Sequence, residues 1–97
     1  MRQILVVEDE VAIADTLVFS LAGEGFAAKH VVLARDALEL LRGGGFDLVI
    51  LDVGLPDMTG FEACKQLRSF SSVPVIFLTA RGEEIDRVVG LEIGADD

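Results

Sequence analysis

Short apolar runs recur along the chain, each closed by polar or turn-forming residues. They occupy residues 3–7, 26–32, 48–51 and 73–78. Runs of this length are typical of β-strands. The run at 48–51 is apolar throughout, which indicates a strand buried on both faces of a parallel sheet. The run at 26–32 is rich in residues with little β preference, so we expect it at an edge of the sheet.

Helical periodicity separates these runs. Helices are expected over residues 10–22, 34–42, 59–68 and 83–93, with loops at 69–72 and 79–82. The second has Ala34, Ala37, Leu38 and Leu41 at i, i+3, i+4 and i+7, the spacing of one helix face. The third begins with capping-box spacing at Thr59 and Glu62, and we expect Phe61, Cys64 and Leu67 on its inner side.

Strict alternation of strand and helix predicts the α/β class, with a parallel sheet joined by right-handed crossovers. The chain has 97 residues, which favours one domain. We find no internal repeat and no linker in it. In such a sheet the carboxyl ends of all strands lie along the same edge, where ligands bind.

Composition limits the classes of function that the chain can have. Apolar residues make up 52% of the chain, which argues against disorder. Seventeen acidic residues against 8 basic ones give a net charge of −9, which disfavours binding to nucleic acid by this chain alone. No apolar run is long enough to span a membrane. One cysteine and no apparent signal peptide lead us to expect a cytoplasmic location.

Three acidic residues follow or end predicted strands. Glu8 and Asp9 follow the first strand, and Asp52 ends the third. If those strands are neighbours, the carboxylates converge and repel one another unless a cation joins them. Mg²⁺ takes such oxygen ligands, and the main-chain oxygen of Gly54 is a further candidate. Asp52 beside a metal is also a candidate nucleophile toward phosphorus.

A hydroxyl group is expected at the same edge. Thr79 follows the fourth strand, and its side chain is placed to donate to a phosphoryl oxygen, while the small Ala80 beside it leaves room. A role as an ordinary helix or turn cap explains Thr79 equally well.

Four motifs together resemble the receiver domain of bacterial two-component response regulators, in the OmpR/PhoB-type transcriptional branch. They are residues 4–10 (ILVVEDE), 51–60 (LDVGLPDMTG), 78–81 (LTAR) and 91–97 (LEIGADD). The likeness spans the chain in the right order and spacing. It implies a flavodoxin-like three-layer sandwich with strand order 2-1-3-4.

The resemblance also implies roles. Asp52 would accept a phosphoryl group from a sensor histidine kinase, and Thr79 would be the switch hydroxyl that follows it. Mg²⁺ would be held by Glu8, Asp9, Asp52 and the Gly54 main-chain oxygen. The protein would signal rather than turn over a substrate, beyond its own phosphorylation and dephosphorylation. The face of the fourth helix would mediate homodimerisation; its matching residues are Arg87, Val88, Leu91, Glu92 and Asp97.

The match stops at Asp97, where receivers continue into a fifth strand and helix. We therefore expect a truncated receiver that lacks the family's phosphate-contacting lysine and its DNA-binding domain, so that DNA contact belongs to the missing part. Lys29 and Lys65 do not match that lysine. The fourth strand would then have an unpaired edge, which offers a second route to self-association.

The remaining candidate residues are expected to have structural roles. We expect His30 to be exposed or packed away from the acids, and Asp57 to shape its loop with Pro56. Cys64 is expected to be a small buried residue. On the first helix four residues match kinase-docking positions, but ordinary packing explains them equally well: Ala14, Asp15, Val18 and Ala22.

Three alternative functions use the same features. A haloacid-dehalogenase-type phosphatase also pairs an Asp nucleophile with Mg²⁺, but it needs a second acid where this chain has Gly54. A non-phosphorylatable interaction module would bind no Mg²⁺ at Asp52. A flavin-binding flavodoxin relative would need a Ser/Thr/Gly phosphate loop after the first strand, which is absent here.

Overall fold

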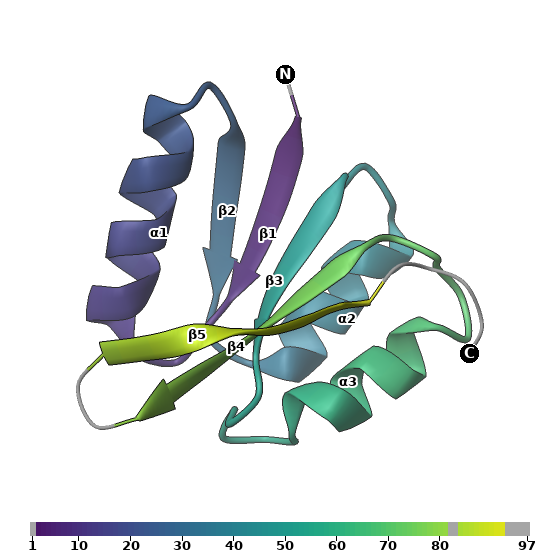
Figure 1. Ribbon diagram of the computed structural model, residues 1–97. Helices are drawn as coiled ribbons and strands as arrows, with labels where there is room; N and C mark the ends of the chain where they lie inside the picture. Colours follow the sequence, from purple (N-terminus) through teal and green to yellow (C-terminus); the bar gives the residue numbers. More distant parts are fainter. Residues whose placement is uncertain (1, 82–83, 93–97) are drawn as a thin grey trace.

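A computed structural model of the chain describes the backbone of residues 2–81 and 84–92 and the side chains of residues 2–78. A central sheet carries helices on both faces (Figure 1). The strands are β1 (Gln3–Val7), β2 (Ala27–Val31), β3 (Leu48–Asp52), β4 (Val75–Arg81) and β5 (Glu84–Glu92). The helices are α1 (Val11–Gly23), α2 (Ala34–Arg42) and α3 (Gly60–Leu67).

The strand order in the sheet is β2-β1-β3-β4-β5. The first four strands are parallel, with β1 between β2 and β3 and with β3 beside β4. The predicted order 2-1-3-4 and the edge position of β2 are confirmed. Strand β1 is thus a direct neighbour of β3, as the convergence of the acidic residues requires.

Alternation along β1 builds two apolar layers. Leu5 and Val7 belong to the core under α2 and α3, whereas Ile4 and Val6 face α1. All four are nearly or fully buried, and burying one such side chain contributes about 1.5–3 kcal/mol. The two layers hold the sheet rigidly between its helices, and so they fix the positions of the strand ends.

The helices largely follow the predicted faces. In α1, Ala14 is buried, and Leu17, Val18 and Leu21 pack against the layer on its side. Phe61 differs from its prediction, because 52% of it is exposed and its ring lies over Phe77 at a centroid distance of 4.9 Å. Among the residues that the structure describes, no helix has the length and apolar character needed to cross a membrane.

The prediction of a helix over residues 83–93 is wrong for residues 84–92, the part of this segment that the structure describes. Glu84–Glu92 forms strand β5 instead, antiparallel to β4, with Arg81 paired to Glu84 and Val75 to Glu92. Without this partner, β4 would present unpaired N–H and C=O groups along its outer edge. The segment is also rich in β-branched residues, which favour strands. Pairing with β4 therefore overrides the helical periodicity.

Strand β4 is longer than predicted. Residues 79–81, expected in a loop, continue the strand, because β5 supplies pairing partners such as Arg87 for Thr79. The outer edge of β4 is occupied by the chain's own β5, so the predicted unpaired fourth-strand edge is wrong. Four candidate dimer residues lie on β5 rather than on a helix, and the fifth lies outside the described residues: Arg87, Val88, Leu91, Glu92 and Asp97. Dimerisation through them stays a prediction.

Candidate metal site

Three carboxylates meet at the carboxyl ends of β1 and β3. The ladder between these strands runs from Ile4 opposite Leu48 to Val7 opposite Leu51. The next residues along the two strands are Glu8 and Asp52. Oxygen atoms of Glu8, Asp9 and Asp52 all lie within 4.8 Å of one another. The predicted convergence of the three acids is therefore confirmed.

Burial makes the charged state of these carboxylates energetically unfavourable. Only 2% of Glu8 and 6% of Asp52 is exposed, whereas Asp9 faces solvent. Burial raises the pKa of Glu8 to about 7; the amide of Glu10 opposes this shift, while the carboxylates of Asp52 and Asp9 add to it. Burial also raises the pKa of Asp52, although the amide of Gly54 partly offsets the effect.

Backbone amides orient the carboxylates of Glu8 and Asp52 through hydrogen bonds. The N–H of Glu10 donates to Oε2 of Glu8 at 3.0 Å, and the N–H of Gly54 donates to Oδ1 of Asp52 at 3.2 Å. Each bond leaves the other carboxylate oxygen of its residue to face the cluster or a ligand. Three oxygen donors of high negative charge at this separation suit a small hard cation, and Mg²⁺ fits this donor set.

Gly60, the first residue of α3, packs closely against the end of β3. Its N–H donates to the carbonyl of Val53 at 2.8 Å. A Cβ atom at Gly60 would collide with the carbonyl oxygen of Asp52 and would lie 3.0 Å from the Cα of Val53. Only glycine permits this approach of α3 to the end of β3.

The loop between β3 and α3 is tied to two helices. Thr59 caps α3 as predicted, its Oγ1 accepting from the N–H of Glu62 at 3.0 Å. Asp57 does more than shape the loop, because its carboxylate accepts from the N–H groups of Ala34 and Arg35, both at 3.0 Å. Asp57 therefore caps α2 from another segment, a role that spacing along the chain cannot reveal.

Three other predicted residues are placed as follows. Thr79 and Ala80 lie in β4, directly after Leu78, which pairs with Asp52. Their backbones are therefore at the same edge as the acids, and their roles stay predictions. His30 was expected away from the acid cluster, which is wrong: its Nε2 lies 2.7 Å from the main-chain oxygen of Glu8.

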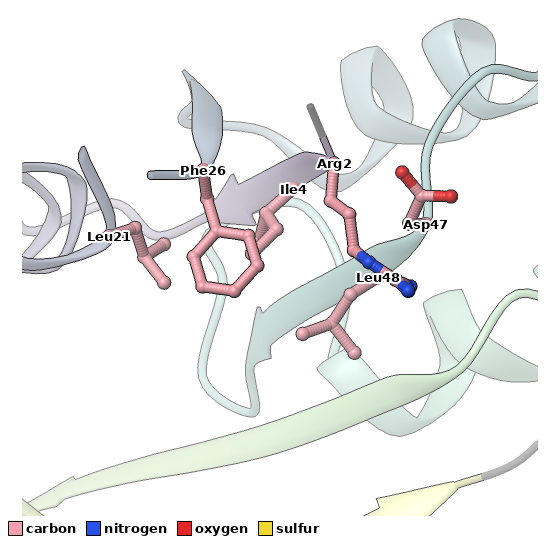
Figure 2. Close-up of a pocket in the computed structure, with 6 residues that line it drawn as sticks. All are labelled: Arg2, Ile4, Leu21, Phe26, Asp47 and Leu48. Carbon is pink, nitrogen blue, oxygen red and sulfur yellow. The ribbon is translucent and has the colours of Figure 1, made fainter. Parts of the chain in front are cut away.

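A cavity of about 410 Å³ lies at the opposite edge of the sheet (Figure 2). It is lined by Arg2, Ile4, Leu21, Phe26, Asp47 and Leu48. These residues lie at or just before the amino-terminal ends of β1 and β3, on α1 and in the segment leading into β2. The acids lie at the carboxyl ends of the strands, so this cavity is no part of the candidate metal site.

An open α/β sheet in order 2-1-3-4 with an acidic cluster at its carboxyl edge defines a receiver-type fold. The chain belongs to the response regulator receiver domain family, which matches residues 4–97. The structure is similar to that of the response regulator TrrA from Thermotoga maritima, solved in complex with Mg²⁺ and BeF. The TM-score is 0.79 and the identity 35%, over 84% of this chain and 72% of that one.

Curated relatives agree with this family. The sensory transduction protein RegX3 of Mycolicibacterium smegmatis is 55% identical over all 97 residues, and the transcriptional regulatory protein CreB of Escherichia coli is 55% identical over 92 residues, 94% of this chain. The chain spans 42% and 40% of the length of these two proteins. The predicted resemblance to response regulators of the transcriptional branch is therefore confirmed.

Proposed function

We propose that this receiver domain is a phospho-acceptor switch in which Asp52 takes a phosphoryl group from a sensor histidine kinase. The observation that carries the proposal is the convergence of Glu8, Asp9 and Asp52 within 4.8 Å at the carboxyl edge of the sheet. Asp52 is the only one of the three that ends a core strand. Its main chain is paired with Leu78 of β4, and Asp52 is therefore the carboxylate that we assign as the acceptor.

The proposed step exchanges one bond to phosphorus for another. An oxygen of the Asp52 carboxylate forms a bond to phosphorus as the bond from phosphorus to the kinase's histidine nitrogen breaks. The electron pair of the broken bond returns to the imidazole, and Asp52 becomes an acyl phosphate. The hydroxyl of Thr79 would then donate to a phosphoryl oxygen.

Mg²⁺ would be held by Glu8, Asp9, Asp52 and the main-chain oxygen of Gly54. When bound, it neutralises the charge that develops on the transferred oxygens. The chain's own contribution is to gather the carboxylates and to keep Asp52 oriented through the N–H of Gly54. The Mg²⁺ and BeF complex of TrrA supports the choice of cation by similarity.

The remaining partners follow from the same proposal. The kinase would dock beside the site on α1, where Asp15 is exposed and Ala14 is buried. Control of DNA would pass through a domain outside these 97 residues, as the names of the transcriptional relatives suggest. A cytoplasmic location suits this partnership. Homodimerisation would involve five residues of the last segment: Arg87, Val88, Leu91, Glu92 and Asp97.

Phosphorylation of the chain with acetyl phosphate and Mg²⁺ tests the proposal. We expect the intact mass to show one added phosphoryl group that hydroxylamine removes, as for an acyl phosphate. The group should be absent from Asp52→Asn and present in Asp36→Asn, a matched change at an exposed position on α2. A phosphoryl group that persists in Asp52→Asn would refute the assignment.

A further inference from the structure

The imidazole of His30 makes a hydrogen bond that the receiver motifs do not include. His30 lies on the edge strand β2 and is half-buried, and its Nε2 is 2.7 Å from the main-chain oxygen of Glu8. A carbonyl oxygen only accepts hydrogen bonds, so Nε2 must carry the proton. The side chain thus donates from one strand to the end of its neighbour.

This bond continues the sheet beyond its last backbone pair. The ladder between β1 and β2 ends with Val7 opposite Val31. The N–H of Glu8 still reaches the carbonyl of Val31 at 3.1 Å. The carbonyl of Glu8 accepts from the His30 ring. Both main-chain polar groups of Glu8 are therefore held by β2.

The carbonyl of Glu8 belongs to the peptide group that joins Glu8 to Asp9. Because a peptide group is planar, a bond that fixes this carbonyl also fixes the directions in which the two residues leave it. Both residues are candidate metal ligands. The Oε2 atom of Glu8 is held in turn by the N–H of Glu10 at 3.0 Å.

We propose that His30 is a positioning residue for the acid cluster: its Nε2–H holds the Glu8–Asp9 peptide so that both carboxylates converge with Asp52. The proposal rests on the proposed function in that the cluster is taken to bind Mg²⁺. His30 itself contacts no ligand oxygen and acts through the main chain. Outer partners of metal ligands commonly affect metal affinity in this indirect way.

Two variants separate this role from simple packing. His30→Leu keeps an apolar bulk and removes the donor, and His30→Gln keeps a terminal N–H at a similar reach. We expect His30→Leu to weaken Mg²⁺ binding about tenfold and His30→Gln to bind almost like the unchanged chain. Equal affinity in His30→Leu and the unchanged chain would overturn the proposal, as would a His30→Gln variant as weak as His30→Leu.

A second readout needs no metal. Hydrogen exchange at the amide of Glu10 reports whether Oε2 of Glu8 stays in place, and we expect it to be faster in His30→Leu than in His30→Gln. If the unchanged chain binds no Mg²⁺, the proposed function fails, and this exchange alone decides the role of His30. In the unchanged chain, ¹⁵N spectra should show the proton on Nε2; a proton on Nδ1 alone would refute the positioning role.

Discussion

The carboxylate oxygens of Glu8 and Asp52 lie within 4.8 Å of each other at the ends of two paired parallel strands, and both side chains are buried. Two negative charges in such a place repel each other and lose their hydration. The arrangement is thus unfavourable for the metal-free fold and favourable for a bound cation.

Replacing Asp52 should stabilise the metal-free chain. Asp52→Asn removes one buried charge and the repulsion on Glu8 while it keeps the side-chain shape. We expect the free energy of unfolding to rise at pH 7.5 without metal, measured by urea denaturation, because burial raises the pKa of Asp52 and makes its charged form unfavourable in the fold. Mg²⁺ should then add stability to the unchanged chain but not to the variant. A destabilised Asp52→Asn would show that the negative charge is compensated in the metal-free state.

The metal-free chain should lose stability as the pH rises from about 4.5 to about 7. The pKa of Glu8 is raised from 4.5 to about 7, so in this window the folded chain binds more protons than the unfolded chain, and folding weakens with rising pH. The shift corresponds to at most about 3–4 kcal/mol. Thermal unfolding across this range checks it.

Glu8→Gln is the control for that experiment, because it removes the titrating group and keeps the shape. Its unfolding temperature should depend less on pH over the same window. Mg²⁺ affinity of the unchanged chain should rise with pH through about 7, since the cation displaces the Glu8 proton. An unfolding temperature that rises across the window in the unchanged chain would contradict the assignment to Glu8.

Gly60→Ala should be destabilising. The added methyl group would collide with the carbonyl oxygen of Asp52, and the resulting shift should cost about 1–3 kcal/mol and weaken Mg²⁺ binding. Gly23→Ala is a matched control, because a Cβ there meets nothing within 4 Å. Urea denaturation of both variants measures the difference. Equal stabilities would mean that α3 does not need to approach β3 so closely.

Asp57→Ala should loosen the amino end of α2. The change removes acceptors for the N–H groups of Ala34 and Arg35, and loss of such a cap costs about 1 kcal/mol. Slight burial acts to raise the pKa of Asp57, but the bonds from these amides outweigh it and lower the pKa below 3.8. The stabilisation should therefore be present above pH 3.8 and disappear as the pH falls below it.

Amide hydrogen exchange in the first turn of α2 is the direct measurement for that prediction. It should quicken in Asp57→Ala at neutral pH and much less in Asp36→Asn, since Asp36 lies in the same turn but makes neither bond. Unchanged exchange at Ala34 and Arg35 in Asp57→Ala would contradict the capping role.

The sequence predicted the parts of the fold that local patterns determine. Apolar runs and capping signals located β1 to β4 and α1 to α3, and strands neighbouring in the sheet brought Asp52 to Glu8 as expected. The helix prediction was wrong for residues 84–92, because the periodicity of a segment contains no information on whether β4 needs a pairing partner along its edge. His30 and Asp57 were missed for a related reason: each reaches a main-chain group on a distant segment.

The most direct test of the account is a calorimetric titration of the chain with Mg²⁺ at pH 8. If Glu8, Asp9 and Asp52 form one cation site, the unchanged chain should bind a single Mg²⁺, and Asp9→Asn and Asp52→Asn should each lose most of that affinity, while Asp36→Asn keeps it. No binding by the unchanged chain, or the same affinity in Asp52→Asn as in Asp36→Asn, would contradict the account.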